Sequence, residues 1–284
     1  MNRIDVFIPT KNSAKTILKT LESLIIADIP INWLIIIDAY SNDNTLEIIK
    51  DWCMKYKVKS LIGHASSGLG NVRLIAETRL IQTDIYLSLD SDIILSSNFF
   101  KSLYPQIMKD SDLVYISSFI LWGDKDSLEY KISQYQNSIR NYQPCIGTTL
   151  IRKGIADFNY MEDISIGEDA IFTRYLLANN KKCKVDYNIY SYHPRSYIST
   201  FKHLISWGKG AREIGNTPLI ELIRFLRTFV TGIKMTIMFK DIKLLIYSPI
   251  RGICHLHGYM IGEGSYTLTI KEELQFIKMT RKGV

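Results

Sequence analysis

An Asp-Ser-Asp triplet at residues 90–92 is the part of the sequence whose spacing most clearly suggests chemistry. The triplet directly follows the apolar run Ile85–Leu89. Residues i and i+2 of an extended segment point to the same side, so the carboxylates of Asp90 and Asp92 can converge on one hard cation. Mg²⁺ and Mn²⁺ are usually bound by one or two carboxylates together with substrate phosphates. The triplet therefore predicts a metal and diphosphate site, although an ordinary acidic turn has the same composition.

Two polar clusters follow earlier apolar runs and suggest a nucleotide site. One cluster begins at Pro9 and the other at Asp38. Thr10 and the backbone amides beside it can contact a nucleotide, Asp38 can accept a hydrogen bond from a base or ribose, and Arg73 can lie against phosphates. Each residue also has an ordinary explanation, as a turn former, a cap or a solvated helix charge. Together with the Asp-Ser-Asp triplet, these two clusters place polar residues at three strand ends, which favours a shared ligand site.

Acidic residues also open a helical pattern later in the chain. Glu168 and Asp169 follow Gly167. Acids at the start of a helix are stabilised by its dipole, and an ionised carboxylate beside a sugar acceptor can also serve as a general base. His193, before Pro194, is either a turn residue or a third metal ligand. Position in the sequence does not decide between these roles.

The elements that must position these residues alternate between strands and helices. Helical patterns lie between the predicted strands, and the first of them has Ser13 as its expected cap. The predicted strands are residues 4–8, 33–37, 58–62, 85–89 and 184–192, and the predicted helices are residues 13–25, 45–56 and 71–81. Strands separated by single helices predict an α/β fold with a mainly parallel sheet and right-handed crossovers. Ligands of such sheets bind beyond the carboxyl ends of the strands.

Composition narrows the class of protein. The chain has 284 residues and 46% apolar residues, which is enough for a substantial core. The four cysteines are far apart and show no spacing typical of a zinc site or a disulfide framework, so a reducing interior is expected. No signal peptide is expected, and no uncharged stretch reaches the roughly 20 residues that a spanning helix needs. These features predict a cytoplasmic protein.

The basic charge lies in the C-terminal region. The net charge is +7, and residues 195–284 hold 14 Lys and Arg against 6 Asp and Glu. Residues 218–239 predict an amphipathic helix with a wide apolar face, followed by an apolar and basic segment, 240–249, and a glycine-punctuated stretch, 251–264. These segments either pack against the rest of the protein or lie in a membrane interface. No reader motif for nucleic acid is present, so no nucleic-acid partner is expected.

Taken in order, these motifs resemble those of the inverting family 2 glycosyltransferases with the GT-A fold. The resemblance is carried by six motifs within about residues 2–195: 7–12, 36–38 with 41–45, 71–73, 87–92, 167–169 and 192–193. It implies a Rossmann-like GT-A domain over residues 1–195. The remaining residues, 196–284, form a basic, mainly helical region, similar in kind to the membrane-associated regions of relatives with polyprenyl-phosphate acceptors.

The resemblance also implies a role for each candidate residue. Asp169, with Glu168 beside it, is expected to be the catalytic base. Metal ligation, of Mn²⁺ or Mg²⁺, is expected from the DXD motif residues Asp90 and Asp92 and from His193. Binding of the nucleotide sugar is expected from Pro9, Thr10, Asn12, Asp38, Tyr40, Arg73, Asp90 and Ser91. The expected partners are a nucleoside-diphosphate sugar donor, a glycan or lipid-linked acceptor, and a membrane surface met through residues 218–264 on its cytoplasmic face.

One position departs from the family pattern. Many relatives have a second acid where this chain has Ala39, so recognition of uracil by that acid is absent and the base stays open. Tyr40 is the alternative contact for the base. Two other functions share some of these features: a nucleotidyltransferase acting on sugar phosphates, and a non-catalytic module that binds sugar nucleotides or membranes. The first usually has a glycine-rich phosphate loop after its first strand, and residues 9–12 contain no glycine.

Overall fold

A computed structural model describes most of the chain. The described residues are 2–65, 69–140, 146–154, 168–194, 197–213 and 215–263. Gly167 of the predicted base motif lies outside them, as do residues 264–284 of the predicted C-terminal region. The predicted boundary between residues 195 and 196 also lies outside, and the division into two domains stays a prediction.

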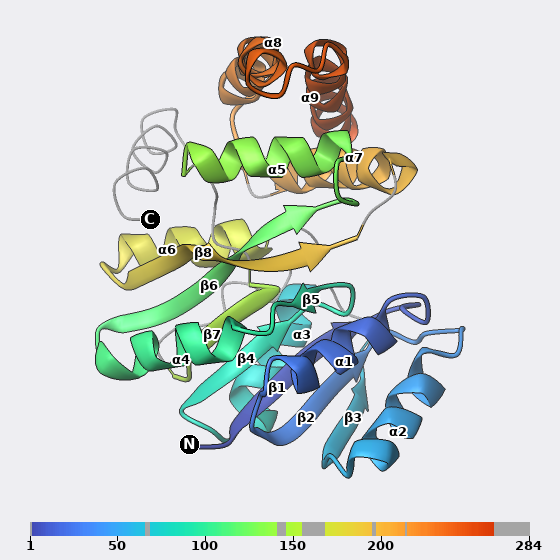
Figure 1. The fold of residues 1–284 in the computed structure, drawn as a ribbon, viewed down its shortest axis with the longest axis vertical. Coiled ribbons are helices and arrows are strands. Elements are labelled where there is room, and N and C mark those ends of the chain that lie inside the picture. The colour runs from blue at the N-terminus through green and yellow to red at the C-terminus, as the bar shows by residue number, and fades with distance from the viewer. Residues whose placement is uncertain are drawn as a thin grey trace.

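An eight-stranded mixed sheet forms the centre of the described structure (Figure 1). Its strands are β1 (Ile4–Thr10), β2 (Ile31–Asp38), β3 (Ser60–His64), β4 (Ile85–Leu89), β5 (Ile94–Leu95), β6 (Leu113–Trp122), β7 (Thr148–Arg152) and β8 (Lys182–His193). Their order across the sheet is β3-β2-β1-β4-β7-β6-β8-β5. The strand pairings show two directions. One direction is shared by β1, β2, β3, β4, β6 and β8, and β5 and β7 run in the other. Polar residues that follow the six parallel strands therefore gather at one edge of the sheet.

Helices cover both faces of this sheet because alternate strand residues point to opposite sides. In β1, Val6 and Ile8 enter one apolar core and Phe7 enters the other. The first core contains α1 (Ile17–Ile26), α2 (Thr45–Tyr56) and α4 (Phe99–Lys109). The second contains α3 (Leu69–Ile75), the π-helical turn η1 (Ala76–Leu80) and α6 (Glu168–Ala178). The predicted α/β fold is confirmed.

Local details differ from the sequence prediction. The first helix begins at Ile17, and Ser13 does not cap it: the Ser13 hydroxyl lies 2.8 Å from the Ser91 hydroxyl instead. Leu18 and Ile25 lie at helical spacing from the buried Leu21, yet both are exposed. A helix was predicted through residue 81, but the backbone changes to π-helical geometry at Ala76. Tertiary contacts outweighed the periodicity at each of these places.

Three further helices lie at the end of the molecule opposite β1–β3 (Figure 1). They are α7 (Tyr197–Glu213), α8 (Pro218–Phe239) and α9 (Lys243–Ile261), and they adjoin α5 (Leu128–Ser138). The predicted helix 218–239 is confirmed. The segments 240–249 and 251–264 were predicted as separate, but α9 is one helix that continues through Pro249. A shared apolar cluster joins Ile132 and Tyr135 of α5 to Met235, Leu244 and Tyr247 of α8 and α9.

Gly208 of α7 and Gly258 of α9 explain why these two helices pack so closely. A Cβ at Gly258 would lie 2.0 Å from the carbonyl oxygen of Ile205, and one at Gly208 would lie 2.0 Å from the carbonyl oxygen of His255. Backbones of α7 and α9 therefore meet without intervening side chains. No helix among the described residues combines the length and apolar character needed to cross a bilayer.

Candidate active site

The candidate site lies along the edge of the sheet where the parallel strands end. Thr10 and Asp38 close β1 and β2, the Asp-Ser-Asp triplet follows β4, and His193 closes β8. Because β7 runs the other way, its first residues lie at this same edge, next to the triplet: the amide of Asp90 donates to the carbonyl of Gly147. All the candidate residues lie within the described part of the chain.

The triplet forms a turn, whereas the sequence pattern suggested an extended segment. The amide of Ile93 donates to the carbonyl oxygen of Asp90 over 3.2 Å, which closes the turn. The two carboxylates consequently have different partners: Asp90 faces Arg73, and Asp92 faces His193. About a third of each side chain is exposed to solvent, 33% for Asp90 and 34% for Asp92. Oxygen atoms of both therefore remain open to a ligand.

Arg73 is buried beneath the site and connects three elements. Its guanidinium donates to the Ser88 hydroxyl over 2.8 Å and to the Asp90 carboxylate over 3.1 Å. A carboxylate oxygen of Glu168 lies 3.4 Å from the same group. Only 4% of the Arg73 side chain is exposed. The sequence suggested that Arg73 lies against phosphates; in the structure Arg73 contacts two carboxylates, those of Asp90 and Glu168.

Gly147 is a site residue whose role the sequence did not reveal. A Cβ at this position would lie 2.0 Å from a carboxylate oxygen of Asp90. Only glycine allows the Asp90 side chain to occupy its place against the start of β7. The sequence signal was weak, since a single glycine in an apolar segment is also typical of a bulge.

His193 is fixed by packing as well as by its ion pair. Nε2 lies 3.1 Å from the carboxylate of Asp92, and the imidazole stacks on the Trp122 ring at a centroid distance of 4.6 Å. Trp122 in turn meets Trp207 of α7 edge to face. The Trp122 contact was not predicted, because β6 was not recognised in the sequence. Asp92 and His193, two residue types that commonly ligate metals, are therefore already held next to each other.

Asp169 and Glu168 occupy the first turn of α6. The Asp169 carboxylate accepts a hydrogen bond from the amide of Ala170. Burial raises the pKa of Asp169 to about 7, and the neighbouring Glu168 carboxylate adds to the shift. Burial also raises the pKa of Glu168, against the opposing effect of Arg73. A carboxyl group that titrates near neutrality suits proton transfer.

The residues predicted to bind the nucleotide lie at the ends of β1, β2 and β3. Asp38 accepts two hydrogen bonds from Ser41, at 2.8 Å from its amide and 2.5 Å from its hydroxyl. Tyr40 is 64% exposed and stacks on His64 at a centroid distance of 5.6 Å. The buried Thr10 hydroxyl has no hydrogen-bond partner among the described residues. His64 was not a predicted site residue, since its strand carries no motif.

Pro9, Asn12 and Ser91 shape the turns around this half. Pro9 lies in β1 opposite Ile37 of β2. Asn12 has a positive φ of 49°, and its side-chain oxygen accepts from the amide of Asn42 over 2.9 Å. Ser91 contacts Ser13 through their hydroxyls. These contacts tie the loops after β1, β2 and β4 into one surface.

The described residues contain no cluster of three or more metal-ligating side chains. The available groups are the Asp92–His193 pair and the partly exposed Asp90 carboxylate. This small donor set suits a cation that completes its shell with diphosphate oxygens and water, as Mg²⁺ usually does. The donor chemistry is therefore compatible with the predicted cation.

Comparisons with known proteins give a consistent family and fold. Residues 5–165 match the model of the family described as glycosyl transferase family 2. No curated protein matches the chain in sequence. Among solved structures, S. aureus TarS 1–349 with UDP-GlcNAc has a TM-score of 0.54 and 18% identity, and the match covers 98% of this chain and 79% of that one.

Two further structures show the same likeness. TarS 1–349 with UDP has a TM-score of 0.52 and 21% identity, and the match covers 72% of this chain but only 64% of TarS 1–349. The mannosyltransferase PcManGT from Pyrobaculum calidifontis, in complex with GDP-Man and Mn²⁺, has a TM-score of 0.56 and 12% identity, with 97% and 79% of the two chains covered. At sequence identities this low, the structural likeness shows a shared fold and nothing more.

Proposed function

Because this chain belongs to glycosyl transferase family 2, we propose that it moves a sugar from a nucleoside-diphosphate sugar to an acceptor hydroxyl or lipid phosphate, with inversion at the anomeric carbon. One observation carries the proposal: three groups lie along one edge of the sheet. They are the polar residues at the ends of β1–β3, the Asp92–His193 pair, and the Asp169 carboxyl group with its raised pKa. Donor departure and acceptor deprotonation can then occur side by side.

The donor nucleotide is proposed to lie over the ends of β1–β3. The Thr10 hydroxyl is buried without a described partner, and Tyr40 offers an exposed ring for stacking on a base. Asp38 is held by Ser41 and can accept from a base or ribose. Pro9 and Asn12 keep the first turn in place. Neighbouring structures contain UDP-GlcNAc or GDP-Man, so the fold accommodates more than one base.

The diphosphate is proposed to lie beside Asp90, Ser91 and Asp92. Asp92 and His193, with Asp90, would hold Mn²⁺ or Mg²⁺, and PcManGT carries Mn²⁺ in its complex. A bound divalent ion would neutralise charge that develops on the departing diphosphate. Arg73 keeps the Asp90 carboxylate oriented, and the absence of a side chain at Gly147 leaves room for that carboxylate.

Asp169 is proposed to remove the acceptor's proton. Its raised pKa of about 7 makes it a stronger base than an ordinary aspartate, yet leaves much of it ionised near neutral pH. Glu168 forms the ion pair with Arg73, and among the described residues no such pair involves Asp169. Attack by the acceptor oxygen opposite the departing diphosphate would invert the configuration.

Membrane contact is proposed through α8 and α9, on the cytoplasmic face of the membrane. Exposed apolar residues recur at helical spacing along α8: Leu219, Leu222, Leu226, Phe229, Val230, Ile233 and Ile237. Ile242, directly before α9, is also exposed, as are Ile246, Ile250 and Ile253 on α9. Basic residues add only about 1 kcal/mol each near an anionic surface, so apolar burial would supply most of the affinity.

Metal-dependent turnover of a donor panel tests the proposed reaction. Full-length protein is incubated with uridine, guanosine and thymidine diphosphate sugars, with Mn²⁺, Mg²⁺ or EDTA, and release of nucleoside diphosphate is measured. We expect turnover with a divalent ion, and Asp92→Asn should lower kcat/KM at least about 100-fold, or ~2.7 kcal/mol. Asp51→Asn is the matched control, since Asp51 is exposed on α2. Equal rates in EDTA, or full activity of Asp92→Asn, would contradict the proposed roles.

A further inference from the structure

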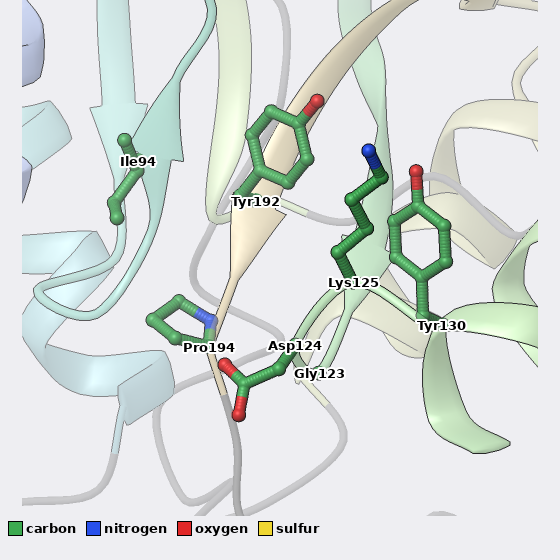
Figure 2. A pocket seen from close by; sticks show the side chains of 7 residues that line it. All are labelled: Ile94, Gly123, Asp124, Lys125, Tyr130, Tyr192 and Pro194. Carbon is green, nitrogen blue, oxygen red and sulfur yellow. The ribbon is translucent and has the colours of Figure 1, made fainter. Parts of the chain in front are cut away.

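A pocket of about 370 Å³ opens beside the candidate site, where β6 and β8 end (Figure 2). Gly123 follows β6 and Pro194 follows β8, and the two ends are joined because the Gly123 amide donates to the carbonyl of His193. The pocket's volume is within the range of small-molecule sites. None of the functions proposed above uses it.

The pocket borders the Asp92–His193 pair without overlapping it. Tyr192 and Pro194, which line the pocket, flank His193 in the sequence, and Tyr192 pairs with Ile94, two residues after Asp92. Side chains of Tyr192 and His193 point to opposite sides of β8 because successive strand residues alternate. A ligand in the pocket would therefore leave the ion pair intact while lying next to it.

Three hydrogen-bond donors reach this pocket. They are the ammonium group of Lys125 and the phenol hydroxyls of Tyr130 and Tyr192. Figure 2 shows the Lys125 side chain between the two tyrosine rings. None of the three groups has a hydrogen bond or ion pair with another described residue. Burial raises the pKa of Tyr130, so its hydroxyl keeps its proton and can donate at neutral pH.

These groups favour an anionic carbohydrate. An ammonium ion and two hydroxyls can all donate to phosphate or carboxylate oxygens. The tyrosine rings offer flat apolar walls for a sugar ring, and Tyr192 is 43% exposed. The Asp124 carboxylate at the rim can accept hydrogen bonds from sugar hydroxyls.

The position of the pocket favours the acceptor over the donor. In the strand order β3-β2-β1-β4-β7-β6-β8-β5, the proposed nucleotide surface lies at β1–β3 and the triplet follows β4. The pocket lies at β6 and β8, on the far side of β4 from that surface. A donor bound over β1–β4 would therefore leave the pocket free for the second substrate.

We propose that this pocket binds the acceptor, and that the acceptor is a carbohydrate carrying a phosphate or carboxylate group, which Lys125, Tyr130 and Tyr192 recognise. This inference rests on the proposed glycosyl transfer. It adds the chemical class of the acceptor and the residues that select it.

Calorimetric titration of the full-length protein with three probes tests the inference. The probes are glucose 6-phosphate, glucose and inorganic phosphate, in buffer without divalent ions so that the metal and diphosphate site does not recruit phosphate. We expect glucose 6-phosphate to bind at least tenfold more tightly than either of the others. Lys125→Met should remove at least most of that preference, and Tyr192→Phe should reduce it by a smaller factor.

The control variant is Lys50→Met, because Lys50 is an exposed lysine on α2. Its preference should equal that of the wild type, and thermal melting should show that Lys125→Met is folded. Equal affinity for glucose and glucose 6-phosphate would overturn the inference. So would equal affinity for inorganic phosphate and glucose 6-phosphate, or an unchanged preference in Lys125→Met.

Binding of UDP and GDP with Mn²⁺ is measured on the same samples. Nucleotide binding without a preference for glucose 6-phosphate would reject the acceptor pocket alone. Absence of nucleotide binding and donor turnover would reject the proposed transfer, and with it the assignment of this pocket to an acceptor, even where the anion preference is found.

Discussion

At the scale of single residues, the site contains more carboxylates than cations among the described side chains. Arg73 contacts both Asp90 and Glu168, while Asp169, next to Glu168, forms no ion pair with an arginine among the described residues. Burial and the neighbouring carboxylate both favour the protonated form of Asp169, which explains why its pKa rises to about 7. The acid–base behaviour of the site should therefore be dominated by this residue.

The rate of sugar transfer should depend on pH through Asp169. A general base acts when deprotonated, so kcat/KM should rise with pH up to a pKa of about 7 and then level off. Asp169→Asn should abolish transfer, while UDP and GDP binding should stay within about twofold. Initial rates from pH 5 to 9, with the donor saturating, provide the measurement. A flat profile in the wild type would be inconsistent with Asp169 as the base.

The same group should make thermal stability depend on pH. The folded-state pKa of Asp169 is raised from its ordinary 3.8 to about 7, so the folded protein binds more protons than the unfolded chain between these values. Its contribution to stability is therefore lost as pH rises through this window. Asp169→Asn should melt at a higher temperature than the wild type at pH 8, and the difference should shrink at pH 4. Calorimetric melting at both pH values checks this.

Gly147 should be needed for activity and not for folding. In Gly147→Ala the new methyl group would meet the Asp90 carboxylate, which can swing away because it ends a flexible side chain. We expect kcat/KM to fall at least about tenfold, or ~1.4 kcal/mol, with little change in melting temperature. Gly63→Ala is the control, because nothing lies within 4 Å of a Cβ there. Full activity of Gly147→Ala would show that the position of Asp90 does not matter.

At the scale of elements, α9 depends on close backbone contact with α7. Gly258→Ala would place a methyl group 2.0 Å from the carbonyl of Ile205, and backbone cannot yield as a side chain can. Overpacking of this kind costs about 1–3 kcal/mol, so the melting temperature should fall by several degrees. Ile253→Ala on the same helix should change it little, because Ile253 is exposed. If the two changes lowered the melting temperature equally, the close contact between α7 and α9 would not be what stabilises α9.

Elements also differ in how far sequence pattern specified them. The helix Thr45–Tyr56 and the strand Ile85–Leu89 have the predicted bounds, because their burial follows one clear period. The bounds of α8 were predicted correctly, but the charged Glu221, which an amphipathic helix would be expected to expose, is buried and contacts His255 of α9. Periodicity indicates that a helix has two faces, while packing decides which face is covered.

At the scale of the whole molecule, α8 and α9 present an apolar surface at one end (Figure 1). Full-length protein should sediment with phosphatidylglycerol vesicles. The variant Leu226→Ser, Val230→Ser, Ile237→Ser should bind at least tenfold less, because exposed apolar side chains would supply most of the affinity. Truncation is less suitable as a test, since α8 and α9 share a core with α5.

The matched control changes three exposed apolar residues far from this surface, as Leu18→Ser, Ile26→Ser and Met54→Ser. Its vesicle binding should equal that of the wild type. Absence of sedimentation would reject membrane contact. Concentration-dependent dimerisation that the α8 variant alone abolishes would instead assign the surface to a second copy of the chain.

The sequence by itself determined the α/β fold, the order of the motifs and the family, because alternating strand and helix periods and ordered short motifs are local properties of the chain. Only the tertiary structure decided which groups meet. Arg73 reaches Asp90 and Glu168, Gly147 makes room for Asp90, and the pocket at Lys125 forms between distant segments. Such contacts depend on strand order and on helix crossings, which bring together residues that no local pattern connects.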